Sequence, residues 1–396
     1  MKQYSLSILV LIIFSACQSK PQQDDWVTNS LNQAREQLAY AVQMLDDTLS
    51  YPRSVNPDGS LHLVEASDWT SGFFPGSLWY MYEYTRDPKW EDQARRWSAG
   101  LAEQQHNRGT HDIGFMLYCS FGNGYRLTGD QEYRAILLEG ARSLASRYNP
   151  RVKAIRSWDW ARNRWSFPVI IDNMMNLELL FWAARESGDQ SFYDIAYNHA
   201  LTTMNNHFRN DFSSFHVVDY DTISGAVRKQ ETFQGHADES AWARGQAWGL
   251  YGYKFCFRET RDPRFLEQAE AIALYYLNHP NLPEDKVPYW DFDAPGIPDE
   301  PRDASAAALV ASALLELSDY TNTHREEYLQ AAEAMLKSLS SPAYLATPGS
   351  NQGFILKHST GYKPVNSEVD KPLNYADYYY LEAMLRYREK KEQTSL

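Results

Sequence analysis

Two kinds of helical segment alternate along the chain. The first kind is amphipathic and rich in Glu, Lys and Arg, and we expect it at about 26–49, 88–106, 131–148, 191–208, 263–279 and 324–340. The second kind is more apolar and rich in small and aromatic residues, at about 72–85, 113–127, 173–187, 240–259, 304–320 and 376–389. A helix that is apolar on most sides is buried, whereas one with a charged stripe faces water. The pattern therefore predicts an all-α fold, a toroid in which six inner helices lie inside six outer ones.

A recurring turn connects most inner helices to the outer helix that follows. Its copies are TRDPKW (Thr85–Trp90), TGDQEY (Thr128–Tyr133), SGDQSF (Ser187–Phe192), TRDPRF (Thr260–Phe265) and, more loosely, TNTHREEY (Thr321–Tyr328). Its Thr or Asp can cap the outer helix, and its Pro falls near the first helical turn. The return connections, among them 149–171 and 210–238, are longer and partly strand-like. They reach the end of the barrel where the inner helices begin, and long irregular loops are often functional.

Each inner helix opens on a polar stretch that contains an aspartate: Asp68, Asp112, Asp172, Asp238, Asp303 and Asp377. Aspartate is a favoured helix N-cap, and we interpret Asp303 and Asp377 in this way. Asp112 and Asp172 instead lie beside strongly apolar residues, in THDIGFM and PVIIDNMMNL. Desolvation and a second carboxylate nearby raise a carboxyl pKa, so such a pair can keep one proton at neutral pH and use it as a general acid. Paired carboxylates are the usual catalytic residues of glycan-cleaving enzymes.

The densest group of candidate binding residues lies in the stretch 232–253. Trp242 and Trp248 can stack on sugar faces, and Arg244 can bind an anionic group. Two structural alternatives stand beside these interpretations: Trp248 can be an ordinary core residue, and Arg244 can pair with a core carboxylate. The residue types alone do not decide between them.

Two further residues are candidates in loops near the same end of the barrel. Trp69, in WTSGFFPGSLW, can form a wall of the cleft, and the glycines at 72 and 76 allow close helix packing. His216, in FHVVDYD, can be an acid, a base or a hydrogen-bond donor, although a lone histidine is more often simply hydrogen-bonded. The sequence contains no HExxH, no CxxC and no phosphate-binding loop, so we expect neither a metal nor a nucleotide cofactor.

The composition and charge of the chain exclude some classes of function. The chain has 396 residues with 43% hydrophobic and 14% aromatic residues, a net charge of −13 and no run of Lys and Arg. Nucleic-acid binding is therefore not expected. The aromatic surplus is typical of helix packing or of a cleft that stacks on carbohydrate. Length alone would suggest two or three domains, but the repeat favours one domain over 26–396.

The N-terminus has the features of a targeting segment. Residues 1–17 combine a positive start, an apolar stretch and small residues before Cys17, which resembles a bacterial lipoprotein signal with lipid attached to that cysteine. The apolar stretch is too short for a stable membrane span. We expect a flexible tether over 18–25 and a lipid-anchored protein of the periplasm or cell envelope. Cys119 and Cys256 lie in apolar helical contexts and are expected to be free, buried thiols.

Several motifs in order resemble one known family. WTSGFFPG, HDIGF, IIDNMMNL, QGHADESAWARGQAW and NYADYYYLEAML are similar to those of the unsaturated glucuronyl hydrolases of glycoside hydrolase family 88, over nearly all of the chain after the signal segment. The resemblance implies an (α/α)6 barrel. It also implies hydrolysis of oligosaccharides that polysaccharide lyases leave with a C4=C5 double bond in the non-reducing uronate. A general acid protonates C4, water adds at C5, and the hemiketal opens and releases the next sugar without a covalent glycosyl-enzyme.

The resemblance also assigns roles to residues. Asp172 matches the general acid/base and Asp112 its carboxylate partner. The pocket for the unsaturated uronate matches His216, Gln234, Trp242, Arg244 and Trp248, with Trp69 as a wall. In the loop 358–372, Ser359 and Lys363 correspond to the region that meets the group beyond the scissile bond, where they can bind a sulfate or carboxylate, or the loop can simply be solvated.

The resemblance favours glycosaminoglycan fragments of the chondroitin, hyaluronan or heparin type, with ulvan fragments as another option. Three rivals stay open: an unsaturated rhamnogalacturonyl hydrolase acting on pectin fragments, a sugar epimerase on the same barrel, and a non-catalytic glycan-binding lipoprotein. Both candidate aspartates are present, which argues against the last. The sequence does not indicate an oligomeric state.

Overall fold

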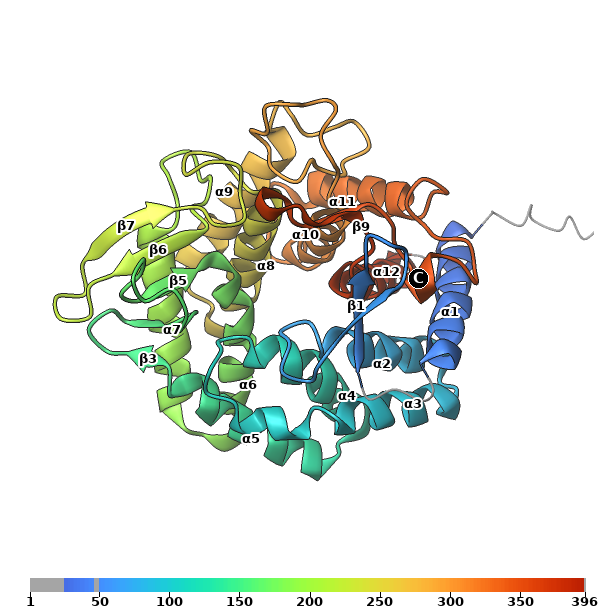
Figure 1. Ribbon diagram of the computed structural model, residues 1–396, viewed down its shortest axis with the longest axis horizontal. Coiled ribbons are helices and arrows are strands. Elements are labelled where there is room, and N and C mark those ends of the chain that lie inside the picture. The colour runs from blue at the N-terminus through green and yellow to red at the C-terminus, as the bar shows by residue number, and fades with distance from the viewer. Residues whose placement is uncertain (1–24, 46–49, 395–396) are drawn as a thin grey trace, which may run out of the picture.

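The twelve α-helices of the computed structural model form a closed double ring (Figure 1). The model describes residues 25–45 and 50–394, so the expected signal segment, Cys17 and nearly all of the tether lie outside it. The inner helices are α2 (Phe73–Thr85), α4 (Asn123–Thr128), α6 (Leu177–Ser187), α8 (Ala243–Thr260), α10 (Ala304–Leu317) and α12 (Asn374–Thr394). The outer helices are α1 (Trp26–Met44), α3 (Pro88–Ala99), α5 (Gln131–Ala145), α7 (Gln190–Asn206), α9 (Pro263–Asn278) and α11 (Arg325–Leu339).

Two of the inner helices begin in a different helical form. A π-helical segment, Gly114–Gly122, leads directly into α4, and a 3-10 helix, Ile171–Asn176, leads into α6. With these segments included, every inner helix contacts the next one, and α12 contacts α2. The ring is therefore closed, and the predicted toroid of six hairpins is confirmed.

Burial explains why the two rings separate. Every residue of α10 except Glu316 is buried, so this helix is stable only when it is surrounded by others. By contrast, α3 buries Trp90, Ala94, Trp97 and Ser98, which recur every three or four residues along one face. The remaining face of α3 meets water. The difference in hydrophobic pattern thus determines which helices form the inner ring.

The recurring turn caps the outer helices as predicted. Asp87, Asp130, Asp189 and Asp262 are the N-caps of α3, α5, α7 and α9, and each side chain accepts the backbone N–H two residues later at 2.9–3.1 Å. The looser fifth copy differs, because His324 holds the N-cap position of α11 without a side-chain cap.

Two inner-helix aspartates that we expected to be caps behave differently. Asp303 is the N-cap of α10, as predicted, and accepts the N–H of Ser305 at 3.1 Å. The prediction for Asp377 is wrong, because this residue lies inside the first turn of α12. Its carboxyl group accepts the backbone N–H groups of Ile355 and Leu356 at 2.9 and 2.8 Å, and so holds a neighbouring loop instead of its own helix.

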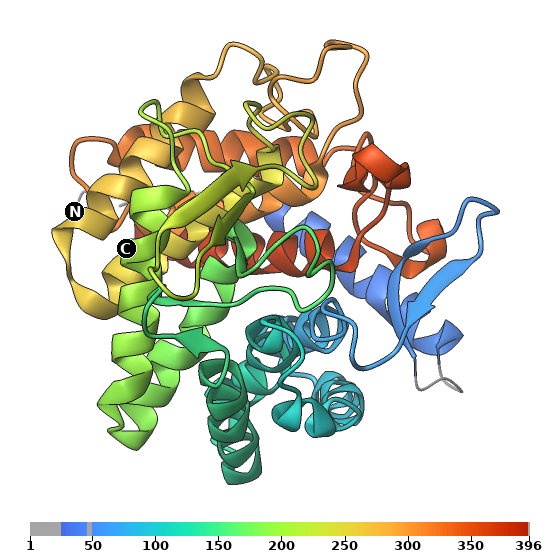
Figure 2. The same cartoon turned by 60° about the vertical axis from the view of Figure 1, so that its left-hand side comes forward.

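Short strands gather where the inner helices begin (Figure 2). They form two-stranded hairpins β1–β2 (Tyr51–Val55, Leu61–Val64), β3–β4 (Tyr148–Asn149, Ala154–Ile155) and β8–β9 (Ser359–Tyr362, Ser367–Lys371), and a three-stranded antiparallel sheet β5–β6–β7 (Pro168–Ile170, Val217–Tyr220, Val227–Glu231). The strand-like character expected for 149–171 and 210–238 is confirmed. The strand β1 also contacts β9, which joins the two ends of the folded chain.

The close helix packing expected at Gly72 is present. A Cβ atom at this position would lie 2.2 Å from the carbonyl oxygen of Phe115, so a larger residue would separate α2 from the π-helical segment. Cys119 and Cys256 are buried and unpaired, as predicted. Within the described residues, no helix is both long enough and apolar enough to span a membrane.

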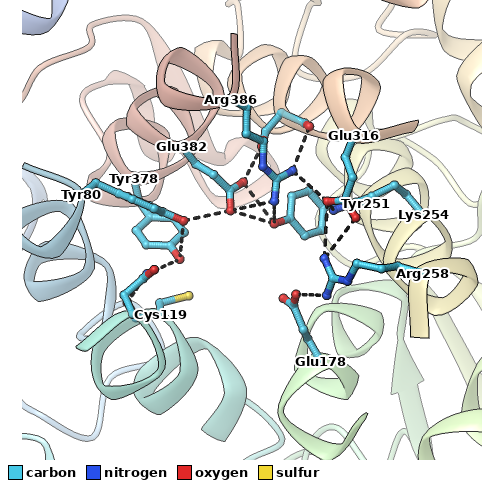
Figure 3. Close-up of polar contacts among 12 residues, drawn as sticks. Tyr80, Cys119, Glu178, Tyr251, Lys254, Arg258, Glu316, Tyr378, Glu382 and Arg386 are labelled. Atoms are coloured by element: carbon cyan, nitrogen blue, oxygen red, sulfur yellow. Dashed lines mark hydrogen bonds and ion pairs between the residues drawn. The ribbon is translucent and has the colours of Figure 1, made fainter. Parts of the chain in front are cut away.

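A network of buried charges fills the other end of the barrel, where the inner helices end (Figure 3). Glu382 accepts hydrogen bonds from Tyr80 at 2.9 Å and Tyr251 at 3.0 Å, and lies 3.3 Å from Arg386. Lys254 pairs with Glu316 at 2.6 Å. Glu382 and its three partners line a cavity of 480 Å³ that also includes Phe115 in its wall.

Candidate active site

A second cavity, of 210 Å³, lies at the end of the barrel where the inner helices begin. It is lined by Asp112, Asp172, Trp69 and Gln234, four of the residues that the sequence indicates. The other lining residues are Arg53, His111, Phe115, Trp158, Ile170, Phe233, Gly361, Tyr362, Ser367, Glu368 and Tyr375. The two candidate carboxyl groups therefore face one shared space, as predicted.

Asp172 reaches this cavity because a buried strand leads directly into it. The apolar run of β5 pairs with β6, and the backbone N–H of Ile171 then donates to the carbonyl of His216 at 3.0 Å. The next residue, Asp172, is only 8% exposed, and its Oδ2 atom has no hydrogen-bond partner. Burial raises the pKa of Asp172 to about 7. The charge of Asp112 adds to this rise, whereas Arg244 opposes it.

Asp112 occupies a more polar position than Asp172. Its side chain is 14% exposed and accepts a hydrogen bond from the hydroxyl group of Thr110 at 2.7 Å. The Nε2 atom of the buried His111 lies 3.3 Å from the other carboxyl oxygen. Of the two carboxyl groups, Asp112 has polar partners, whereas Asp172 has the buried environment that favours a proton.

The tautomer of His216 follows from its contacts. Its Nδ1 atom accepts the backbone N–H groups of Phe233 and Gln234 at 3.1 and 3.0 Å. Burial holds the pKa of His216 well below its usual value, so the ring is neutral and carries its proton on Nε2. This Nε2 atom lies 3.6 Å from Oδ2 of Asp172 and has no hydrogen-bond partner.

The indole N–H of Trp248 is a third unpartnered polar group at this place. Trp248 is fully buried and favours the charged form of Asp172. Its N–H group, the Nε2 atom of His216 and the Oδ2 atom of Asp172 are buried together, and none of the three is in a hydrogen bond of normal geometry. Buried polar groups are nearly always hydrogen-bonded, so these three atoms indicate a site made for a polar ligand or for water.

Arg244 and Trp242 lie behind the cavity wall. Arg244 pairs with Asp303 at 2.7 Å and donates to the carbonyl oxygens of Thr360 and Gly361 at 2.5 Å each. The structural alternative, a pair with a core carboxylate, is therefore the arrangement observed. The guanidinium group lies 4.5 Å from the centre of the Trp242 ring, and this ring lies 4.8 Å from that of His216.

The structure does not bring Ser359 and Lys363 to this cavity. Ser359 is fully buried in β8. Lys363 lines a different cavity, together with His358 and Asp370. Both residues belong to the β8–β9 hairpin, and other parts of this hairpin, at 361–362 and 367–368, do line the site.

Sequence reasoning missed several lining residues that come from distant parts of the chain. Arg53, on β1, pairs with Glu368, on β9, at 2.7 Å and with Asp68 at 2.9 Å. Trp158 and Phe233 are contributed by the two long return loops. In the sequence, only the length and irregularity of these two loops indicated that they contribute to a site. In the described residues, no group of three or more His, Cys, Asp or Glu side chains is arranged to hold a metal ion.

Comparison with known proteins tests the family resemblance that the motifs of the sequence suggest. The family model for Glycosyl Hydrolase Family 88 matches residues 43–391. An unsaturated glucuronyl hydrolase of Formosa agariphila is 52% identical over 340 residues, which cover 85% of this chain and 84% of that protein. An unsaturated chondroitin disaccharide hydrolase of Streptococcus pneumoniae is 33% identical over 347 residues, covering 85% of this chain and 86% of that protein.

A solved structure is similar over almost the whole fold. The crystal structure of an unsaturated glucuronyl hydrolase specific for heparin superposes with a TM-score of 0.91 at 54% identity, and covers 93% of this chain and 99% of its own. These matches extend over the barrel and over the loops that build the cavity. The chain is therefore a glycoside hydrolase and belongs to family 88.

Proposed function

We propose that the chain removes a 4,5-unsaturated uronic acid from the non-reducing end of oligosaccharides that polysaccharide lyases produce. The observation that carries this proposal is Asp172, a buried carboxyl group with a free Oδ2 atom and a pKa raised to about 7 beside a second carboxyl group. A carboxyl group of this kind carries a proton at neutral pH and can donate it to carbon or oxygen.

The proposed reaction is a hydration of the C4=C5 vinyl ether. Asp172 donates its proton to C4, and positive charge develops at C5 and the ring oxygen. A water molecule adds to C5 and returns a proton to the Asp172 carboxylate, which restores the acid. The C5 hemiketal then opens, C1 becomes a hemiacetal, and its collapse releases the next sugar. One water molecule is consumed for each uronate removed.

The other residues of the site position the substrate and the acid in this scheme. Burial raises the pKa of Asp172, and the charge of Asp112 adds to this rise. His216, whose Nε2 atom lies 3.6 Å from Oδ2 of Asp172, and Trp248, which favours the charged form of Asp172, act on the acid from behind the cavity wall. Trp69 and Gln234 contribute to the wall and rim of the cavity. Arg244 fixes the β8 strand and adds positive charge behind Asp172.

For the substrate class we propose glycosaminoglycan fragments, with the heparin type first. The similar crystal structure at 54% identity is of an enzyme specific for heparin, and the relative at 33% identity is a chondroitin disaccharide hydrolase. Greater similarity to the heparin-specific enzyme supports this order.

A panel of unsaturated disaccharides tests the proposal. The purified chain should remove the ultraviolet absorbance of the C4=C5 bond from at least one unsulfated disaccharide made by heparin, chondroitin or hyaluronan lyase. The matched saturated disaccharides should remain intact under the same conditions. If no member of the panel loses its absorbance, the proposed function is wrong.

We also propose that the chain is anchored to the cell envelope by a lipid on Cys17. The support is the sequence Ser15-Ala16-Cys17 after the apolar stretch. A Cys17→Ala variant should then move from the membrane fraction to the soluble fraction of expressing cells, whereas membrane retention of this variant would contradict the anchor.

A further inference from the structure

A continuous path of aromatic rings leads from the cavity to the protein surface. Tyr362, Phe233 and Trp158 line the cavity, and their neighbouring ring centres are 5.1 and 5.4 Å apart. Trp160 follows, with its ring centre 4.9 Å from that of Trp158 and the two planes 32° apart. Trp160 does not line the cavity, and 49% of its surface is exposed. A half-exposed tryptophan at the end of such a path offers a flat face to a ligand that extends out of the cavity.

The loop that carries these rings is basic in an acidic protein. Between Arg147 and Arg164 the sequence has six Arg or Lys residues and one acidic residue, Asp159, although the whole chain has a net charge of −13. Figure 1 shows this loop between β3 and β5, beside the β5–β6–β7 sheet. A local excess of positive charge attracts anionic ligands even when the net charge of the protein is negative.

Arg162 is an exposed cation of this loop that shares its nearest carboxylate with other cations. Asp159 is paired first with the buried Arg147 at 2.7 Å and then with Arg156 at 3.3 Å. Arg162 lies 3.8 Å from the same carboxyl group, and 71% of its side chain is exposed. One carboxylate thus faces three guanidinium groups. The Nε atom of Arg162 donates to the backbone carbonyl of Asp159 at 3.1 Å, and its terminal nitrogens can bind a carboxylate or sulfate of a ligand.

From these observations we infer an outer subsite, built by Trp160 and Arg162, for the sugars that follow the leaving sugar of an acidic oligosaccharide. The inference rests on the proposed function, because the unsaturated uronate must occupy the cavity for the rest of the oligosaccharide to leave along the aromatic path. Trp160 stacks on the face of a downstream sugar, and Arg162 pairs with a carboxylate or sulfate on it. The chain then prefers tetrasaccharides to disaccharides with the same terminal uronate.

The test compares a disaccharide and a tetrasaccharide of the series that the chain cleaves best. Trp160→Ala should raise KM for the tetrasaccharide about five- to tenfold, the effect of losing one aromatic stacking contact, and should change the disaccharide less than about twofold. Trp160→Phe keeps a ring and should restore most of the difference. Arg162→Gln should weaken tetrasaccharide binding in the same selective way, and added salt should reduce the difference between wild type and this variant. Lys89→Gln, which removes an exposed cation from the outer helix α3, is the matched charge control.

Two results would overturn the outer subsite: equal losses on both substrates, or no loss on the tetrasaccharide. Melting temperatures of the variants separate a loss of folding from a loss of contact. Calorimetric binding of both oligosaccharides to the Asp172→Asn chain gives the same comparison without turnover. A chain that binds the tetrasaccharide more tightly but does not cleave either compound would keep the subsite and refute the proposed function.

Discussion

A carboxyl group is buried to a similar extent at each end of the barrel, but its pKa is raised at one end and lowered at the other. Asp172, where the inner helices begin, is 8% exposed, and Glu382, towards the other end, is 7% exposed. Burial raises the pKa of Asp172 to about 7. Burial also acts to raise the pKa of Glu382, but Arg386 and Lys254 outweigh it, so this pKa lies below its usual value.

The number of donors around each group explains the difference. Glu382 accepts hydrogen bonds from Tyr80, Tyr251 and Ser312 and pairs with Arg386. The Oδ2 atom of Asp172 accepts none. A buried charge that is fully paired belongs to the structure, whereas one that is left without partners belongs to a site. Exposure alone therefore does not distinguish a structural carboxylate from a candidate acid, but the partner set does.

The strongest test of this comparison is removal of the candidate acid. Asp172→Asn should lower kcat at least about a thousandfold, because the amide cannot donate the proton that the vinyl ether needs. Binding of the oligosaccharide, measured by calorimetry, should change little. Turnover at the wild-type rate in this variant would remove Asp172 from its proposed role.

The corresponding change in the charge network should affect stability. Glu382→Gln should lower the free energy of unfolding by about 3 kcal/mol, because it leaves buried cations with fewer partners. Urea denaturation at pH 8 measures this loss. In the same experiment Asp172→Asn should leave stability unchanged or raise it, since a carboxylate without partners is costly to bury above its pKa. Equal losses in the two variants would contradict the distinction between the two ends.

The smallest expected effect is on the pH profile. Asp172 must hold its proton to act as an acid, so kcat/KM should fall about tenfold per unit as the pH rises above about 7. The charge of Asp112 helps to raise the pKa of Asp172, so Asp112→Asn should shift this fall in kcat/KM to lower pH. The profiles are measured by the loss of ultraviolet absorbance. If kcat/KM of Asp112→Asn falls at the same pH as that of the wild type, the two carboxyl groups are not coupled.

Local patterns in the sequence predict much of this molecule. The alternation of apolar and charged helices predicts the double ring, and the recurring turn predicts four outer-helix caps. The apolar surroundings of Asp112 and Asp172 mark the two carboxyl groups that the fold brings to one cavity. Each of these features depends on residues that are close together in the sequence, so a short stretch of sequence is enough to predict it.

The features that were missed depend on pairs that are far apart in the sequence. Arg53 and Glu368 are contributed by opposite ends of the folded chain, and no periodicity connects them. The placement of Ser359 could not be foreseen for a similar reason, because alternate residues of a strand face opposite sides and the register of β8 is set by its partner β9. Lys254, one of the cations that act on Glu382, lies on α8, far in the sequence from Glu382 on α12, so no local pattern connects the two residues.

Phe115 forms part of the wall of both cavities, and its ring packs against those of Trp69, Phe73 and Trp248, so aromatic side chains separate the two cavities along the axis of the toroid. A polysaccharide cannot thread through such a molecule, and only a chain terminus can reach Asp172. The leaving sugar and the altered uronate must then depart through the mouth by which they entered. The sugar nearer to the mouth has to leave first, and the uronate product, retained deeper, is the species expected to compete with fresh substrate.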